Sequence, residues 1–161
     1  MYLLLKCKCF FLRMEKIKRR SNCPISSSLD IFGDKWSLLI IRDMMFFNKF
    51  TYGDFLKSEE RIATNILASR LQGLEENKLI EKLEHPDSKA KVLYRLTQKA
   101  LDLLPAIVEI YLWADRYLDI PAELKATFRE AKKDKVAFIK TATKQLKKQL
   151  DDNRIKKEVV D

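Results

Sequence analysis

Glycine and proline are scarce in this chain, with only three glycines and four prolines in 161 residues. These residues most often end helices and form turns, so their scarcity favours long helices and disfavours an all-β fold, which needs many turns. Hydrophobic residues make up 47% and charged residues 34% of the chain, which is typical of proteins that fold around a core. We therefore expect one mostly helical domain with appendages.

The positive charge of the chain is concentrated at its two ends. The net charge is +9, of which residues 1–22 carry +6 and residues 121–161 carry +5, so that residues 23–120 carry −2. Basic segments of this kind either keep a protein soluble or bind nucleic-acid phosphates, and the sequence leaves both interpretations open. We divide the chain into a basic N-terminal extension (1–22), a central domain (23–120) and a basic helical C-terminal extension (121–161).

The first residues of the chain indicate the cellular compartment in which the protein is expected. All three cysteines lie within the first 23 residues, too few and too clustered for a disulfide framework, which favours a reducing cytoplasm. The apolar start is interrupted by Lys6 and Lys8, far short of the roughly 20 apolar residues of a membrane span, and it lacks the cleavage site of a signal peptide. We expect a cytoplasmic protein that is not bound to a membrane. A native start at Met14, with residues 1–13 as an upstream extension, is a hypothesis.

Caps and apolar spacing predict three helices at the start of the central domain. Pro24 suits a first helical position and Gly33 a left-handed C-terminal cap, which predicts a first helix between them. A second helix is expected to start at Asp34 and to end near Phe47. Thr51 is expected to cap a short third helix.

The fourth predicted helix, over about 63–77, has two different faces. Leu67, Leu71 and Leu74 share the face that we expect in the core. The opposite face carries short polar side chains in place of the Lys and Glu that are common elsewhere in this chain. Such groups can read base edges in the major groove of DNA, and an ordinary solvated face is the alternative. The candidate DNA-binding residues of this helix are Thr64, Asn65, Ala68, Ser69, Arg70 and Gln72.

Two strand-like segments, 79–84 and 91–96, follow this helix. A turn rich in Pro, Asp and Ser separates them, which predicts a β-hairpin. Lys89, Lys91 and Arg95 lie in or after its tip and are candidate contacts to DNA phosphates. A charged, exposed hairpin without such a role fits the pattern equally well.

Thr97 is expected to cap a helix over 98–118, which Pro105 should kink or break near Leu104 because proline removes a backbone hydrogen bond. Two apolar stripes run along this helix and need two partners. One can cover the domain, and the other is most economically buried against the same helix of a second chain. Amphipathic helices are expected after Pro121, docked on the dimer, with a membrane surface as the alternative partner. The candidate dimerisation residues are Leu103, Ile107, Ile110, Tyr111, Trp113, Ala114 and Tyr117.

This order of elements is that of a winged helix-turn-helix, an α+β fold that is mostly α with a small β-hairpin wing, here with a long dimerisation helix and extra C-terminal helices. The segments that resemble one family of this fold are the Cys-Pro pair at 23–24, the run Gly33-Asp34-Lys35-Trp36 within 29–40, the segments 67–80 and 94–97, and Leu104, Pro105 and Trp113. Over about 23–118 the chain is similar to the HxlR-type regulators. The resemblance implies a cytoplasmic homodimer that binds double-stranded operator DNA, with the fourth helix in the major groove and the wing on the neighbouring backbone.

The resemblance also bears on Cys23. In several HxlR-type regulators the cysteine that Cys23 matches responds to oxidants or electrophiles. A helix N-terminus close to Lys18, Arg19 and Arg20 favours the thiolate through the helix dipole and the nearby cations. Cys23 is therefore a candidate redox sensor, and a semi-buried cysteine that only packs is the alternative.

Three positions depart from the family pattern. Ala63 stands where a capping Ser is usual, and Thr64 is a possible substitute. Lys78 stands where Gly is usual, so either Asn77 takes the left-handed conformation or the turn is strained. Gly73 lies inside the fourth helix, where it costs about 1 kcal/mol relative to Ala.

The sequence offers little for catalysis or metal binding. Its one histidine, His85, falls on the predicted hairpin, and no glycine-rich phosphate loop occurs. Cys7-x-Cys9 lacks the further ligands of a zinc site. We expect no enzyme activity, cofactor, metal or small-molecule ligand. The expected function is sequence-specific DNA binding by a transcriptional regulator; the alternative is a winged-helix protein-interaction module without specific DNA binding, suggested by the −2 charge of residues 23–120.

Overall fold

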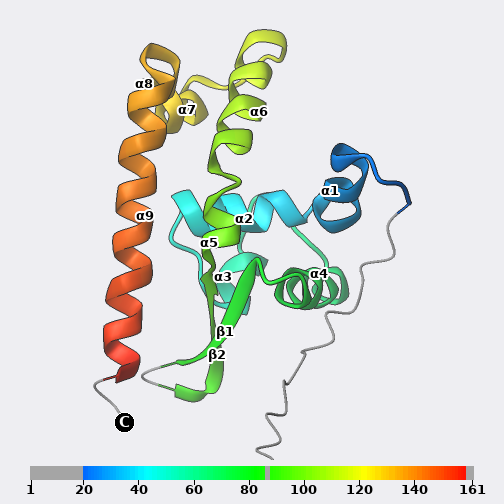
Figure 1. The fold of residues 1–161 in the computed structure, drawn as a ribbon, viewed down its shortest axis with the longest axis vertical. Coiled ribbons are helices and arrows are strands. Elements are labelled where there is room, and N and C mark those ends of the chain that lie inside the picture. The colour runs from blue at the N-terminus through cyan, green and yellow to red at the C-terminus, as the bar shows by residue number, and fades with distance from the viewer. Residues whose placement is uncertain (1–19, 86–87, 159–161) are drawn as a thin grey trace, which may run out of the picture.

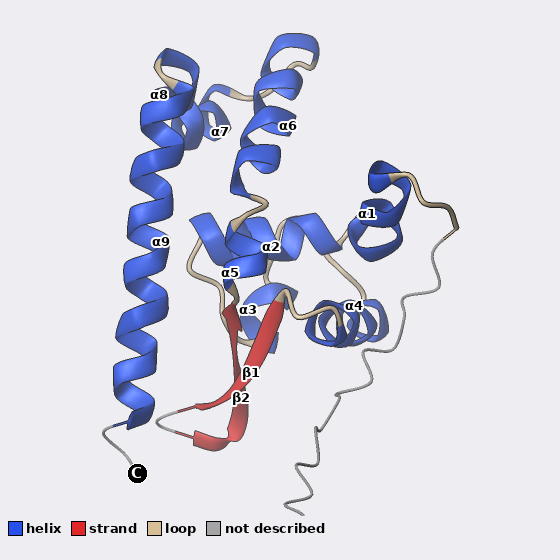
Figure 2. Cartoon of the chain, in the orientation of Figure 1, coloured by secondary structure: helices blue, strands red, loops and turns tan. Residues whose placement is uncertain are grey.

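The computed structural model describes residues 20–85 and 88–158, and the described chain is mostly helical with one two-stranded antiparallel sheet (Figure 1). The predicted fold class is confirmed. The hairpin projects from the helical region, and a long C-terminal helix runs beside that region (Figure 2). The elements are α1 (Pro24–Phe32), α2 (Ser37–Phe46), α3 (Tyr52–Leu56), α4 (Thr64–Glu76), β1 (Ile80–His85), β2 (Ser88–Leu96), α5 (Gln98–Leu101), α6 (Leu104–Tyr117), α7 (Ala122–Lys125), the 3-10 turn η1 (Ala126–Phe128), α8 (Arg129–Lys133) and α9 (Lys135–Glu158).

The core lies where α2, α3, α4, the base of the hairpin, α5 and α6 meet. The predicted apolar face of α4 is buried, since Leu67, Leu71 and Leu74 are each at most 1% exposed. Ile41 and Met44 of α2 are fully buried opposite them. Because one face of α4 is committed to the core, its other face is left at the surface.

The second strand begins three residues earlier than the sequence predicts, whereas the first has the predicted length and is displaced by one residue. Their regular pairing runs from Ile80 and Leu96 to Glu84 and Val92, and an irregularity follows before the last pair. The last pair joins His85 and Ser88, which we expected in the turn. Cross-strand pairing here overrides the weak β propensity of polar residues.

A short segment before α3 adds to the edge of this hairpin. Thr51 forms an isolated antiparallel bridge with Leu93, and the backbone N–H of Tyr94 donates to the carbonyl oxygen of Phe50 at 2.7 Å. The sequence did not predict this pairing. It joins the base of the hairpin to the start of α3.

The start of α2 and the role of Gly33 differ from the predictions. Gly33 has φ −78°, so the expected left-handed cap is wrong. Glycine is required there by a close approach instead, since a Cβ atom would lie 2.4 Å from the carbonyl oxygen of Leu29. Asp34 precedes α2 rather than beginning it. Its Oδ1 accepts hydrogen bonds from the backbone N–H groups of Trp36 at 2.8 Å and Ser37 at 3.0 Å.

The predicted threonine caps are confirmed. The Thr51 hydroxyl accepts from the backbone N–H of Asp54, whose carboxylate accepts from the backbone N–H of Thr51, so that α3 begins with a capping box. Thr97 caps α5 through the backbone N–H of Ala100. Thr64 does not cap α4, because it is the first helical residue and Ala63 occupies the cap position without a side-chain hydrogen bond.

The end of α4 is a left-handed turn at Lys78. Lys78 has φ 57°, whereas Asn77 has φ −82°, so the second of the two predicted alternatives holds and the lysine itself takes the left-handed conformation. The N–H of Lys78 donates to the carbonyl of Glu75 at 2.8 Å, and that of Leu79 to Leu74 at 2.9 Å. These two bonds form a Schellman motif, which directs the chain from α4 into β1.

The segment predicted as one helix over 98–118 is broken into α5 and α6. The break precedes Pro105, which lies in the first turn of α6, as predicted. The C-terminal extension then folds back on α6, where the Phe128 ring stacks on Tyr111 with 4.2 Å between centroids and also meets Phe46 and Phe138. Within the described part of the chain, every helix is too short or too polar to cross a bilayer.

Candidate DNA-binding surface

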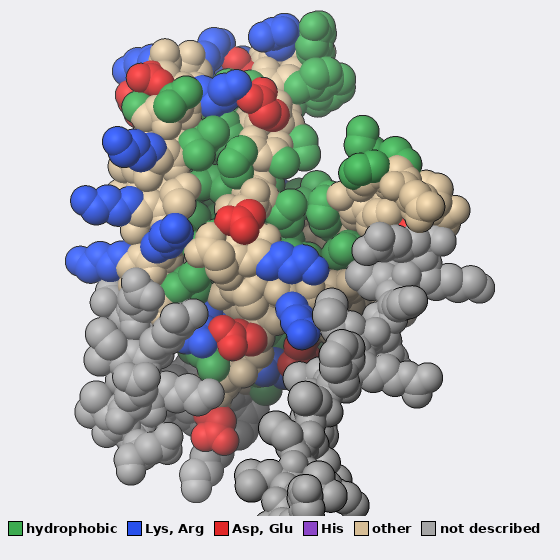
Figure 3. Space-filling model, in the orientation of Figure 1, with side chains coloured by type: hydrophobic (Ala, Val, Ile, Leu, Met, Phe, Trp, Pro, Cys, Tyr) green, Lys and Arg blue, Asp and Glu red, His purple; other side chains and the backbone are tan. Residues whose placement is uncertain are grey.

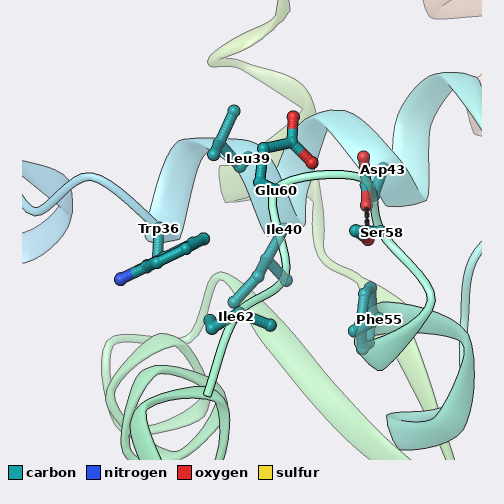
Figure 4. A pocket seen from close by; sticks show the side chains of 8 residues that line it. All are labelled: Trp36, Leu39, Ile40, Asp43, Phe55, Ser58, Glu60 and Ile62. Atoms are coloured by element: carbon teal, nitrogen blue, oxygen red, sulfur yellow. Dashed lines mark hydrogen bonds between the residues drawn. The ribbon is translucent and has the colours of Figure 1, made fainter.

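A buried carboxylate holds the connection between α3 and α4. Asp43 of α2 is 2% exposed and accepts hydrogen bonds from the Ser58 hydroxyl at 2.5 Å, the Lys49 ammonium at 2.9 Å and the Arg42 guanidinium at 2.6 Å. Arg42 also donates to Glu60 at 2.7 Å. Figure 4 shows Asp43 and Ser58 facing each other across this connection. The bonds fix the loop that leads into α4, and thereby the start of α4 against α2.

The charge state of Asp43 follows from these contacts. Burial raises the pKa of its carboxyl, but the hydrogen bonds from Ser58, Lys49 and Arg42 outweigh burial and hold the pKa below its usual value. The group is therefore ionised at neutral pH and paired with two cations. The cavity beside it measures only about 10 Å³, room for about one water. Its lining, drawn in Figure 4, is Trp36, Leu39, Ile40, Asp43, Phe55, Ser58, Glu60 and Ile62.

The surface face of α4 carries the polar residues singled out in the sequence. They project away from the buried leucines because residues on opposite sides of a helix cannot share the core. Apart from Arg70, all of them are exposed to solvent: Thr64, Asn65, Ala68, Ser69 and Gln72.

Two of these side chains are held by neighbours on the same surface. Arg70 is half-buried and lies 3.3 Å from the carboxylate of Asp34. Although burial raises the pKa of Asp34, the hydrogen bonds from Ser37 and from backbone N–H groups, with the charge of Arg70, bring that pKa below its usual value. The Gln72 amide donates to Glu76 at 2.8 Å. Arg70 and Gln72 are thus oriented along the helix surface.

A hollow of about 450 Å³ lies between α4 and the hairpin. Gln72 lines its α4 side and Tyr94 its hairpin side. The Tyr52 hydroxyl donates to the carbonyl of Thr64 at 2.8 Å, and an ion pair of 2.5 Å between Lys82 and Glu75 joins β1 to α4.

The sequence did not single out Tyr52, Lys82 and Tyr94 as part of this surface. Each lies on a different element from α4, and the hollow arises only when the hairpin folds beside that helix. The periodicity of a single helix or strand does not indicate which other element packs beside it. The hollow therefore extends the candidate surface beyond what the pattern of α4 indicates.

The basic residues of the hairpin are placed differently from one another. The side chains of Lys89 and Lys91 lie outside the described residues. Arg95 is 8% exposed and pairs with Glu81 at 2.7 Å, and its Nη1 is buried without a hydrogen-bond partner. This buried position differs from the exposed one that a phosphate contact requires.

Cys23 lies at the surface, immediately before α1. It occupies the N-cap position, its thiol is free, and its backbone N–H donates to the Ser21 hydroxyl at 3.2 Å. Of the three cations expected nearby, Arg20 forms an ion pair with Asp30 at 2.5 Å, and Lys18 and Arg19 lie outside the described residues. Access to the thiol is thus open, while one of the cations is already paired.

The candidate dimerisation residues divide between the two sides of α6. Ile107 is 8% exposed, and Leu103, Tyr111 and Ala114 are partly buried within the chain itself. The other three form an apolar patch at the surface. Figure 3 shows hydrophobic side chains exposed over α6 and also over α1, where Ile25 and Leu29 are exposed. The patch consists of Ile110, Trp113 and Tyr117, which are 53%, 57% and 62% exposed.

Among the side chains that the structure describes, no group of three or more His, Cys, Asp or Glu is placed to hold a metal ion. The carboxylates of Asp43 and Glu60 beside the small cavity are instead bonded to protein donors. Their arrangement is accounted for by the packing of α2 against the loop before α4.

A helix-turn-helix formed by α3 and α4, followed directly by a β-hairpin, defines a winged helix-turn-helix protein. The model of the HxlR-like helix-turn-helix family matches residues 31–121, more than half of the chain. The chain belongs to this family of transcriptional regulators, as the sequence resemblance predicts.

Relatives of known name support this assignment. The HTH-type transcriptional regulator YodB of Bacillus subtilis is 32% identical over 98 residues, which cover 60% of this chain and 87% of YodB. Among solved structures, PA1607 is 38% identical with a TM-score of 0.58, covering 65% of this chain and 71% of PA1607. A MarR-family protein of Porphyromonas gingivalis W83 is 31% identical with a TM-score of 0.54, covering 61% of this chain and 95% of that protein. The family match ends at residue 121, so most of the C-terminal extension lies beyond it.

Proposed function

We propose that this protein regulates transcription by binding a specific duplex DNA sequence through α4. The observation that carries the proposal is the exposed polar face of α4 in a helix-turn-helix. An amide such as Asn65 or Gln72 can form two hydrogen bonds with adenine, and a hydroxyl such as Ser69 can bond to any base. Ala68 is small enough to contact a thymine methyl group.

The test is fluorescence anisotropy of the protein on duplex DNA from its own upstream region and on a scrambled duplex. We expect the upstream duplex to bind about a thousandfold more tightly at physiological salt. Substitution of Asn65→Ala together with Gln72→Ala should reduce this preference, by about 1–3 kcal/mol for each base contact that is lost. The matched control is Gln98→Ala with Gln145→Ala, two exposed amides on other helices, which should leave the preference unchanged.

Two outcomes contradict the proposal in different ways. An unchanged preference in the Asn65 and Gln72 variant would remove the reading role from this face of α4. Equal, weak binding of both duplexes by the wild-type protein would favour the protein-interaction alternative that the −2 charge of residues 23–120 suggests.

We further propose that the protein acts as a homodimer that buries the apolar patch of α6. The patch is formed by three large side chains that the chain leaves more than half exposed, although α8 and α9 already cover another side of α6. Exposed apolar surface of this kind is typical of interfaces. The other candidate residues are partly or fully buried within the chain itself: Leu103, Ile107, Tyr111 and Ala114.

Sedimentation velocity tests the dimer. Trp113→Glu should convert a dimer into a monomer, because it puts a charge into the centre of the apolar patch. Val136→Glu places the same charge at an exposed apolar position on α9, 74% exposed, and should leave the dimer intact. A Trp113→Glu protein that sediments as wild type would place the interface elsewhere.

We also propose that Cys23 senses oxidants or electrophiles. The exposed, free thiol before α1 is accessible to a reagent, and YodB, the relative described above, has been solved in a quinone-bound form. Quinone or diamide should change the DNA affinity of the wild-type protein and leave that of Cys23→Ser unchanged. An equal response in both proteins would rule out Cys23 as the sensor.

The proposed partners are therefore operator DNA and a second copy of the chain, and the proposed site of action is the cytoplasm. The proposal includes no catalysis, cofactor, membrane or small-molecule ligand. The names of the relatives as transcriptional regulators support this class of function.

A further inference from the structure

The C-terminal helix α9 presents a lysine face to solvent. Lys140, Lys144, Lys147 and Lys148 are all exposed, and at about 100° per residue they span an arc of about 100° on one side of the helix. The opposite side is buried against the rest of the chain, where Ala142 and Leu146 are 9% and 5% exposed. We call these four residues the lysine face of α9.

Between residues 135 and 150, the lysine face has no acidic neighbour in the sequence. Residues 135–150 contain five lysines and no Asp or Glu, and among the described side chains, which end at Leu150 in this helix, no carboxylate forms an ion pair with the four lysines. The lysines that precede them are different. Lys132 pairs with Asp115 at 2.7 Å, and Lys133 pairs with Glu130 at 2.8 Å. Positive charge thus accumulates along the middle turns of α9, between Lys140 and Lys148.

The turns that carry these lysines lie closer to the wing than the start of α9 does (Figure 1). Along the longest axis of the molecule, α9 begins at the end occupied by α6 and α8 and finishes at the end occupied by the tip of the hairpin (Figure 1). Lys and Arg side chains line the outer edge of α9 in the space-filling view (Figure 3). In winged helix proteins the wing contacts the DNA backbone beside the recognition helix, so a basic helix that finishes at the wing end extends that contact line.

We propose that the lysine face, through Lys147 and Lys148, binds the phosphate backbone of DNA that flanks the segment read by α4. The inference rests on the proposed function, because it assumes that α4 and the wing lie on DNA. A lysine contact to phosphate releases a counterion and adds affinity without sequence preference. A duplex is a better fit than a membrane surface, because the exposed surface beside the lysine face carries Thr141, Gln145 and Gln149, whereas a membrane-binding helix has bulky apolar residues there.

The test compares two variants with the same change in charge. Lys147→Gln with Lys148→Gln removes the two lysine-face charges that lie nearer the wing end of α9, and Lys140→Gln with Lys144→Gln removes two charges that lie on average about 8 Å earlier along the helix. This separation is about one Debye length at physiological salt, so contacts at the two positions are distinguishable. Glutamine has nearly the helix propensity of lysine, so α9 should stay folded in both variants.

Affinity is measured by anisotropy across a salt series, on an upstream duplex with long flanks and on a scrambled duplex of equal length. For Lys147→Gln with Lys148→Gln we expect weaker binding of both duplexes, an unchanged ratio between them, and a plot of log affinity against log salt that is less steep by about 2 per chain. The change for Lys140→Gln with Lys144→Gln should be clearly smaller. These results together support the proposal.

Three results overturn it. Unchanged salt dependence in the Lys147 and Lys148 variant, with intact operator preference, refutes the inference and leaves the proposed function standing. Equal losses in the two variants show an effect of net charge rather than a contact. Unchanged DNA binding combined with loss of binding to phosphatidylglycerol vesicles assigns the face to a membrane.

The wild-type protein separates this inference from the proposed function. If it binds operator and scrambled duplex alike, the proposed specificity fails while the lysine contact is still measurable on either duplex. If it binds no duplex at all, both proposals fail.

Discussion

The left-handed residue at the end of α4 gives a prediction whose size follows from the backbone. Lys78 has φ 57°, a conformation that costs a residue with a Cβ atom about 1–2 kcal/mol. Glycine avoids this cost but loses more backbone entropy on folding, which offsets about 0.5–1 kcal/mol of the gain. The Lys78 side chain is exposed, and its carbonyl, which accepts from the Thr97 hydroxyl at 2.7 Å, is retained in glycine. We therefore expect Lys78→Gly to stabilise the protein by about 1 kcal/mol.

The assay is urea unfolding followed by circular dichroism, with the slope of the transition compared between proteins. A gain of about 1 kcal/mol should raise the melting temperature by roughly 2–4 °C in a chain of this length. The matched control is Lys78→Ala, which removes the same charge and side chain but keeps the Cβ atom, and should leave stability nearly unchanged. The reasoning is refuted if alanine stabilises as much as glycine, or if glycine destabilises.

Three further predictions concern stability. Gly73→Ala should stabilise by about 1 kcal/mol in urea unfolding, because a Cβ atom there meets nothing within 4 Å and alanine is the better helix former; a loss would mean an unseen constraint on α4. Asp43→Asn should destabilise by about 3 kcal/mol at pH 7. Because the pKa of Asp43 is lowered on folding, its contribution is present above the unfolded pKa of about 4 and is lost as the pH falls through the folded value. A urea series from pH 7 to pH 3 should therefore narrow the difference between variant and wild type. Phe128→Ala should cost about 3–5 kcal/mol in thermal unfolding, since its ring is 6% exposed among three aromatic rings, whereas Val136→Ala at an exposed site should cost little.

Local rules predicted those parts of the fold that depend on neighbours in sequence. The spacing of Leu67, Leu71 and Leu74 identified the buried face of α4, because helical periodicity alone decides which residues share a side. Thr51 was recognised as a cap because capping involves groups only three residues away. The break before Pro105 follows from the missing N–H of proline.

The features that the sequence did not predict depend on groups far apart in the chain. The bridge between Thr51 and Leu93 joins segments more than forty residues apart, and no local pattern marks it. The burial of Arg95 follows from its ion pair with Glu81 on the other strand, a consequence of strand register. Lys78 is a local exception, because the Schellman hydrogen bonds that outweigh the intrinsic preference of lysine join residues at most five positions apart.

The two sides of α6 explain how a family domain can carry a C-terminal extension and still have a face for a second copy. Tyr111, which stacks on Phe128 of the extension, points roughly 100–160° away around the helix from Ile110, Trp113 and Tyr117 at about 100° per residue. The extension therefore covers one side of α6 and leaves the apolar patch exposed on the other. Since α9 reaches the wing end from the covered side, the proposed dimer contact and the proposed phosphate contact use different surfaces. Substitutions in the apolar patch should therefore change the oligomeric state, and substitutions in the lysine face should change salt-dependent DNA binding. If α9 packed over the patch, the two effects could not be separated.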